Sequence, residues 1–144
     1  MNIHSKKYTL SAPTKDRMSK QLASYICQEF EDVVTVYLFG SFIREGQFSD
    51  IDLGLLFKKD VSEALSLELA LETRLEELFG HPFDVRVLNG APNSFAYNVV
   101  RTGNIIVDFD TNFRAGFEGN VLKKYFDFAY FRRRYLKEVG HAEI

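Results

Sequence analysis

Residues 33–57, VVTVYLFGSFIREGQFSDIDLGLLF, hold two hydrophobic segments joined by a polar connection. The first segment, residues 33–39, is β-branched or aromatic almost throughout, which predicts a strand covered on both faces. It ends at Gly40 and Ser41. The second segment, residues 50–57, opens with polar residues and continues with apolar ones. We therefore expect a second strand in which the first residues are functional and the remaining residues belong to the hydrophobic core.

The rest of the chain predicts helices and two further strands around this pair. Four segments have the apolar spacing or composition of helices: 14–30, 61–79, 93–102 and 112–138. Two more segments have strand composition, and a turn follows the first of them: 83–88, 105–108 and the turn 89–92. This order, with its short connections, predicts an α/β (α+β) fold in which a mixed four-stranded sheet is backed by helices. We expect one domain over residues 1–144, with a C-terminal helix.

The composition excludes several classes of protein. The chain has 144 residues, 46% hydrophobic and 26% charged, with no apolar run long enough to span a membrane, so we expect a soluble globular protein. The N-terminus lacks the apolar core of a secretory signal, and the single cysteine, Cys27, cannot form an internal disulfide. Both observations favour a cytoplasmic location. A net charge of −2 argues against direct nucleic-acid binding as the main task.

Three acidic residues are predicted to converge at the start of two strands. Asp50 and Asp52 project from the same face of their strand because side chains alternate along a strand. If the strand beginning at Phe83 lies beside this one, Asp84 adds a third carboxylate. Such a cluster requires cations for neutralisation, and hard oxygen ligands select Mg²⁺. Two such ions would clamp the attacking and leaving oxygens of a phosphoryl-type displacement.

The turn before these carboxylates supplies hydrogen-bond donors. Gly40 allows the backbone to approach a phosphate closely, and the N–H groups and the Ser41 hydroxyl, at an expected helix start, can bind its oxygens. Arg44 can add charge-assisted contacts. The combination predicts a site for a metal-bound nucleoside triphosphate such as ATP.

A second Asp-x-Asp tripeptide, Asp108-Phe109-Asp110, serves as an internal control. It has no Gly-Ser turn upstream, and it lies where a strand leads into a helix, a place where acidic residues commonly act as caps. We therefore expect a structural role for it. Arg86 shares a strand face with Asp84, and two interpretations remain open: it contacts phosphate, or it offsets the acidic cluster.

The residues Tyr37 to Ser41, followed by Ser49 to Leu53, resemble the signature of the DNA polymerase β-like nucleotidyltransferase superfamily and of its minimal nucleotidyltransferases. The resemblance extends over most of the chain. Three further segments match the family's third acidic strand, the turn after it, and its closing helix and strand: Phe83 to Val85, Leu88 to Pro92, and Val100 to Val107. Length and element order resemble the MntA-type antitoxins, which pair with HepT-type toxins, RNases of the HEPN class.

This resemblance implies a protein adenylyltransferase that moves AMP from ATP to a tyrosine of the HEPN toxin, releasing pyrophosphate and neutralising the toxin in a hetero-oligomeric complex. Carried over to this chain, Gly40 and Ser41 would bind the phosphates, and Asp50 and Asp52 the Mg²⁺ ions. Asp84 would bind a metal and help to deprotonate the nucleophile. Arg44 stands where the family often has an arginine.

The connection between Ser41 and Asp50 has eight residues, fewer than is usual in the family, and Glu45 displaces the glycine after Arg44 to Gly46. Two other functions remain open. One is nucleotidyl transfer to a small alcohol of the aminoglycoside type, which would require a partner subunit. The other is a non-catalytic module that masks a toxin.

The C-terminal segment, residues 109–138, is a candidate docking surface for a partner protein. Residues 123–137 carry six basic side chains against Asp127 alone, and residues 60–77 carry six acidic ones against Arg74 alone. Nine of the 21 aromatic residues lie within the C-terminal segment: Phe109, Phe113, Phe117, Tyr125, Phe126, Phe128, Tyr130, Phe131 and Tyr135. One helix face cannot hold them all, so some are expected at a protein interface. The acidic helix is interpreted as a solvated face.

Overall fold

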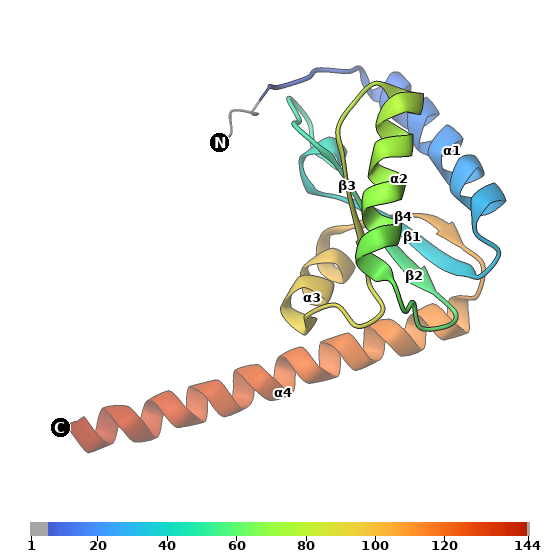
Figure 1. The fold of residues 1–144 in the computed structure, drawn as a ribbon. Helices are drawn as coiled ribbons and strands as arrows, with labels where there is room; N and C mark the ends of the chain where they lie inside the picture. The colour runs from blue at the N-terminus through green and yellow to red at the C-terminus, as the bar shows by residue number, and fades with distance from the viewer. Residues whose placement is uncertain (1–5, 144) are drawn as a thin grey trace.

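A computed structural model describes residues 6–143, without the side chains of 141–143. Its centre is a four-stranded sheet in the order β3-β2-β1-β4 (Figure 1). The strands are β1 (Val33–Phe39), β2 (Ile51–Phe57), β3 (Phe83–Val87) and β4 (Asn104–Asp108). β1 pairs antiparallel with both β2 and β4, whereas β3 runs parallel to β2. The predicted mixed sheet is confirmed.

Four α-helices cover the two faces of this sheet. They are α1 (Ala12–Glu29), α2 (Ala64–Phe79), α3 (Asn93–Thr102) and α4 (Thr111–Glu143). α1 and α2 pack on one face, around core residues such as Leu38 and Leu53. α3 and the start of α4 pack on the other face, around Tyr37 and Leu56. Because β1 has helices on both sides, all its residues are buried, as its composition predicted.

Helix ends follow local signals, with small shifts from the predicted bounds. α1 begins two residues earlier than expected, because the Ser11 hydroxyl accepts a hydrogen bond from the Thr14 N–H (3.3 Å) and Pro13 is tolerated in a first turn. α2 ends at Gly80, whose φ of 75° closes the helix in the left-handed conformation. The sequence places five apolar residues on one stripe of α2 and predicts that all of them are buried: Ala64, Leu67, Leu71, Leu75 and Leu78. This prediction is wrong for Leu78, which is 47% exposed.

The acidic side of α2 is not wholly a solvated face, which corrects the prediction for two of its residues. Glu68 accepts a hydrogen bond from the Val87 N–H, and Glu72 accepts one from the Val85 N–H, both at 2.8 Å. β3 lies at an edge of the sheet, so these N–H groups point away from β2. The two glutamates therefore accept hydrogen bonds from the outward N–H groups of β3, which no neighbouring strand pairs with.

α4 is one continuous helix despite Gly116 and Gly119, and at about 50 Å it is much longer than the sheet is wide. Its first part is anchored: the Tyr37 hydroxyl donates to Glu118 (2.6 Å), and Val121 is buried. Figure 1 shows the helix running beneath the molecule and continuing past α3 to the C-terminus. Between Phe126 and Glu138, every residue except Ala129 is exposed.

Candidate functional site

The strand register places two of the three predicted carboxylates side by side. Asp52 of β2 is the direct partner of Asp84 of β3, and on its other side it faces Phe39, the last residue of β1. Adjacent strands lie about 4.8 Å apart, and paired residues share a face, so the two carboxylates are near neighbours. Asp50 lies one residue before β2. The strand begins at Ile51, not at 50 as predicted, because the first β3-side hydrogen bond runs from the Ile51 N–H to the Pro82 carbonyl (2.9 Å).

The charge of this group of acids is not balanced by its neighbours. The pKa of Asp52 is raised to about 7, first because the side chain is largely buried and then because Asp84 and Asp50 repel its ionised form. Arg86 and Arg44 oppose this shift without cancelling it. All the donors are carboxylate oxygens, the class of ligand that Mg²⁺ prefers. A divalent cation would relieve the repulsion, so these residues fit such an ion.

Gly40 brings the turn after β1 directly onto Asp52. Its φ is 78°, a conformation that favours glycine, and a Cβ built at this position would lie 2.0 Å from Asp52 Oδ2. Ser41 follows in η2 (Gly40–Ile43), a short 3₁₀ helix, where the expected helix start is found. The Asp52 carboxylate therefore occupies the space in which a side chain at position 40 would lie, so this packing requires glycine.

Arg86 offsets part of the negative charge of the acidic cluster, in keeping with one of the two interpretations that the sequence leaves open. Its Nε donates a hydrogen bond to Asp84 Oδ1 (3.1 Å), and this bond is the main reason why the pKa of Arg86 is raised. The guanidinium also lies 5.4 Å from the centroid of the Phe95 ring of α3. Arg86 is thus held against β3 by one acid and one aromatic ring.

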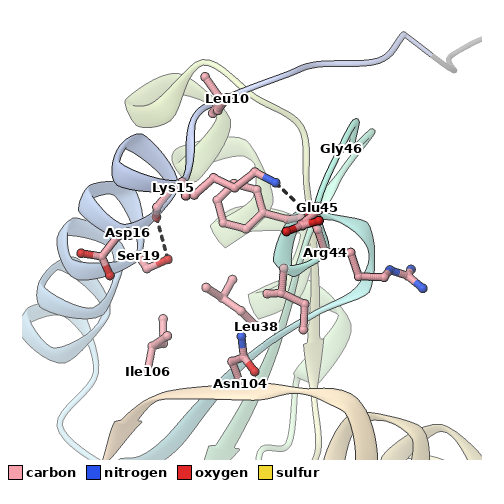
Figure 2. A pocket seen from close by; sticks show the side chains of 13 residues that line it. Leu10, Lys15, Asp16, Ser19, Leu38, Arg44, Glu45, Gly46, Asn104 and Ile106 are labelled. Atoms are coloured by element: carbon pink, nitrogen blue, oxygen red, sulfur yellow. Dashed lines mark hydrogen bonds between the residues drawn. The ribbon is translucent and has the colours of Figure 1, made fainter.

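Lys15 of α1 is a contributor that the sequence did not reveal. Its Nζ donates to the Arg44 carbonyl (3.0 Å) and lies 5.4 Å and 5.3 Å from the centroids of the Phe42 and Phe48 rings. Figure 2 shows Lys15 extending from α1 toward Arg44 and Glu45, while the Arg44 side chain points away from the other residues that line this cavity. Lys15 therefore ties α1 to the segment between the turn and Asp50.

The cavity in Figure 2, of about 460 Å³, does not belong to the carboxylate site. It is lined by Leu38 and Ile106, which face α1, whereas Asp52 lies on the sheet face covered by α3 and α4. A second cavity, of about 420 Å³, lies along the outer edge of β3 and does reach the site. Asp84 and Arg86 line it, together with residues of α2 and the start of α3.

The second Asp-x-Asp tripeptide has a structural role, as expected. Asp110 accepts a hydrogen bond from the Phe113 N–H (3.0 Å) at the start of α4 and pairs with Lys58 (2.6 Å). Asp108 pairs with Arg114 (3.0 Å) and accepts from the Thr35 and Thr111 hydroxyls. These contacts cap α4 or join the end of β4 to β1, to α4 and to the segment after β2.

Among the described side chains, no group of three or more His, Cys, Asp or Glu residues is arranged so that it could hold a metal ion by itself. In the same part of the chain, no helix combines the length and the apolar character needed to cross a bilayer.

The C-terminal segment divides into a packed part and an exposed part. Phe113 and Phe117 pack against the core beneath the sheet, and Tyr125 stacks on Tyr97 of α3 with ring centroids 3.6 Å apart. Six large side chains further along α4 are each more than half exposed: Phe126, Phe128, Tyr130, Phe131, Tyr135 and Leu136. We call these six residues the tail surface.

Comparison with known proteins gives one family and several structures. The family model for "Polymerase beta, Nucleotidyltransferase" matches residues 20–112. A structure of a tri-AMPylated Shewanella oneidensis HEPN toxin in complex with an MNT antitoxin holds a chain similar to this one, with a TM-score of 0.70 and 18% identity, covering 87% of this chain and 98% of that chain. No curated protein gives a significant match to the sequence.

Two further structures show the same likeness. One is the toxin–antitoxin MntA–HepT, with a TM-score of 0.69 and 17% identity over 86% of this chain and 97% of that chain. The other is a toxin–antitoxin with AMP-PNP, with a TM-score of 0.70 and 18% identity over 84% and 97%. At sequence identities of 17% and 18%, the similarity to these structures shows a shared fold and no more.

Proposed function

Because this chain belongs to the polymerase beta nucleotidyltransferase family, we propose that it transfers AMP from ATP to a tyrosine hydroxyl of a HEPN-type toxin and so neutralises the toxin. The observation that carries this proposal is the in-register pair of Asp52 and Asp84 beneath the turn at Gly40. Structures of similar fold include an AMPylated HEPN toxin with its antitoxin and a complex with AMP-PNP, which favours this acceptor and this nucleotide.

Asp50, Asp52 and Asp84 would hold Mg²⁺, in keeping with the raised pKa of Asp52. Phosphate oxygens of ATP would complete the coordination, since the protein side chains do not do so alone. When bound, Mg²⁺ supplies charge neutralisation at the reacting phosphate and its leaving group.

Gly40, Ser41 and Arg44 would bind the triphosphate. Because Gly40 has no side chain, the turn lies directly against Asp52, and Ser41 offers its hydroxyl and its backbone N–H at the start of η2 to a phosphate beside that carboxylate. Arg44 follows at the end of η2, and its charge already acts on Asp52. Lys15, through the Arg44 carbonyl, would hold this loop in place.

The proposed step is an in-line displacement at the α-phosphorus. The tyrosine oxygen forms a bond to that phosphorus, the bond from it to the oxygen bridging to the β-phosphorus breaks, and pyrophosphate leaves. The hydroxyl proton passes to Asp84, which lies on the strand farther from the turn. Arg86 orients Asp84 through its hydrogen bond.

The tail surface is proposed to hold the toxin in a hetero-oligomeric complex in the cytoplasm. Its aromatic side chains are exposed and lie among Arg132, Arg133, Arg134 and Lys137, a composition typical of protein interfaces. The excess of basic residues here fits an acidic surface on the toxin.

The test is incubation of the protein with ATP labelled at the α-phosphate, Mg²⁺ and a HEPN-type toxin protein. We expect label on the HEPN protein, and loss of label when its acceptor tyrosine is replaced by phenylalanine. Neutralisation of the toxin without label would instead show a masking module. Label on a small alcohol but never on the protein would show the small-molecule function.

A further inference from the structure

We propose that the groove along the outer edge of β3 receives the segment of the acceptor protein that carries the modified tyrosine. This segment has lysine or arginine residues as well as apolar residues beside that tyrosine. This inference rests on the proposed function and names the surface that selects its acceptor. The β3 groove is defined by six of the residues that line the 420 Å³ cavity: Leu65, Glu68, Leu69, Glu72, Asp84 and Phe95.

The order of the strands determines the direction from which the acceptor arrives. The turn at Gly40 follows β1, Asp52 lies on β2, and Asp84 lies on β3, so these groups form a row across the sheet. In an in-line displacement, the nucleophile and the leaving group lie on opposite sides of the phosphorus. If pyrophosphate leaves from the turn, the hydroxyl approaches from the β3 side. The β3 groove lies on that side and reaches Asp84.

The groove contains apolar side chains that are exposed to solvent and are not part of the hydrophobic core. Leu65 and Leu69 of α2 are 68% and 55% exposed, and they lie one helical turn apart on the same side of the helix. The Phe95 ring of α3 also lines the groove and packs against Phe39 and the Arg86 guanidinium. This apolar surface beside the reaction centre is suited to bind an aromatic side chain and its neighbours.

The charge of the groove indicates the chemistry of its occupant. Glu68, Glu72 and Asp84 line it against one guanidinium, that of Arg86, whose pKa the two glutamates also raise. Each glutamate uses one oxygen to accept a hydrogen bond from β3, and its second oxygen accepts none from the described residues. Lysine or arginine residues next to the tyrosine would complement this excess of negative charge.

The same hydrogen bonds exclude one mode of binding. A peptide that added a strand to β3 would need the outward N–H groups of Val85 and Val87, and Glu72 and Glu68 already occupy both. The acceptor segment is therefore recognised through its side chains.

The test is steady-state kinetics of label transfer with the HEPN protein as the varied substrate. In the double variant Glu68→Gln/Glu72→Gln, the amide oxygens still accept the β3 hydrogen bonds while both charges are removed. We expect KM for the HEPN protein to rise about tenfold, with kcat and KM for ATP nearly unchanged, and the effect to shrink at high salt. Glu76→Gln/Glu77→Gln, on the same helix outside the groove, is the matched control and should leave KM unaltered.

A second pair of variants tests the apolar wall. Leu65→Ser/Leu69→Ser should raise KM for the HEPN protein about tenfold, whereas Leu78→Ser, an exposed leucine of α2 outside the groove, should not. Because these side chains are exposed, the variants should fold, and unchanged affinity for a non-hydrolysable ATP analogue checks that they do.

The outcomes separate this inference from the function on which it rests. Absence of label on the HEPN protein with the unaltered chain would refute the proposed function. Normal labelling by the unaltered chain, together with an unchanged KM in both groove variants, would refute the β3 groove alone.

Discussion

Two Asp-x-Asp tripeptides in this chain have opposite electrostatic environments. In the first, Asp52 lies largely buried beside two other carboxylates, and its pKa is raised to about 7. In the second, Asp110 is paired with Lys58 and caps α4, and its pKa is lowered, mainly by the Lys58 hydrogen bond. The same pattern of residues thus gives a site with uncompensated negative charge in one place and a site with compensated negative charge in the other.

The difference arises from position in the fold. The first tripeptide lies at the start of β2, between the turn after β1 and a parallel strand that brings in Asp84. The second ends β4 and leads into α4, so Arg114 of that helix can reach Asp108. Asp108 and Asp110 are each paired with a cationic side chain and stabilise the structure, whereas Asp52 has no such ion pair among the described residues and is available to bind a ligand.

The largest expected effect separates the two tripeptides by activity. Asp52→Asn should reduce AMP transfer by on the order of 10³-fold, since loss of a metal ligand removes several kcal/mol of transition-state stabilisation. Asp110→Asn should change the rate less than threefold, because the contacts of Asp110 among the described residues are with Lys58 and the start of α4. Initial rates of label transfer check both. Equal losses in the two variants would contradict the assignment.

A second prediction concerns the turn above the first tripeptide. Gly40→Ala should lower transfer about 100-fold or more, because the new methyl group would displace Asp52 Oδ2. The control is Gly46→Ala. Gly46 also has a positive φ, at 95°, but its Cβ would meet no atom within 4 Å, so it incurs only the backbone strain of about 1 kcal/mol. Similar rates for the two variants would show that space beside Asp52 is unimportant.

The pH dependence of activity should follow the first tripeptide. Mg²⁺ binds the ionised carboxylate, so at low Mg²⁺ the rate should fall as pH drops through about 7, the pKa of Asp52. Because metal and proton compete, raising the Mg²⁺ concentration should move this midpoint to lower pH. Rates measured from pH 5.5 to 9 at several Mg²⁺ concentrations test this. A midpoint insensitive to Mg²⁺ would contradict it.

The smallest effect is on the stability of the metal-free protein. A raised pKa means that Asp52 destabilises the fold once it ionises, so its penalty is absent below about pH 4 and complete above about pH 7. At pH 8 without Mg²⁺, Asp52→Asn should therefore stabilise the protein by about 1–2 kcal/mol, allowing for solvent screening.

Asp108→Asn should have the opposite sign and destabilise the protein by about 1 kcal/mol, because it weakens the contacts to Arg114 and Thr35. Urea unfolding of both variants at pH 8 in EDTA provides the measurement. Destabilisation by Asp52→Asn would show that its carboxylate is already balanced.

Much of the site could be predicted because its signals are local. The hydrophobic strand that ends in Gly40 and Ser41, and the tripeptide that opens the next strand, lie within 25 residues, and alternation along a strand determines which side chains share a face. The placement of Asp84 needed one further assumption, that β3 lies beside β2, which the register confirms.

Other features could not be predicted because they depend on tertiary contacts. Nothing in the sequence near Lys15 indicates that it bonds to the Arg44 carbonyl, which lies 29 residues away. The hydrogen bonds from β3 to Glu68 and Glu72 exist because β3 is an edge strand, and strand order is not a local property. The apolar spacing of α2 likewise does not show where its neighbours end, so Leu78 was wrongly expected to be buried.

The central claim, that the first tripeptide binds divalent cations and the second does not, can be tested without a partner protein. Mn²⁺ binding in the presence of a non-hydrolysable ATP analogue can be titrated by electron paramagnetic resonance for the unaltered chain, Asp52→Asn and Asp110→Asn. We predict protein-bound Mn²⁺ in the unaltered chain and in Asp110→Asn, and its loss in Asp52→Asn. Retention of Mn²⁺ by Asp52→Asn, or its loss in Asp110→Asn alone, would contradict the account.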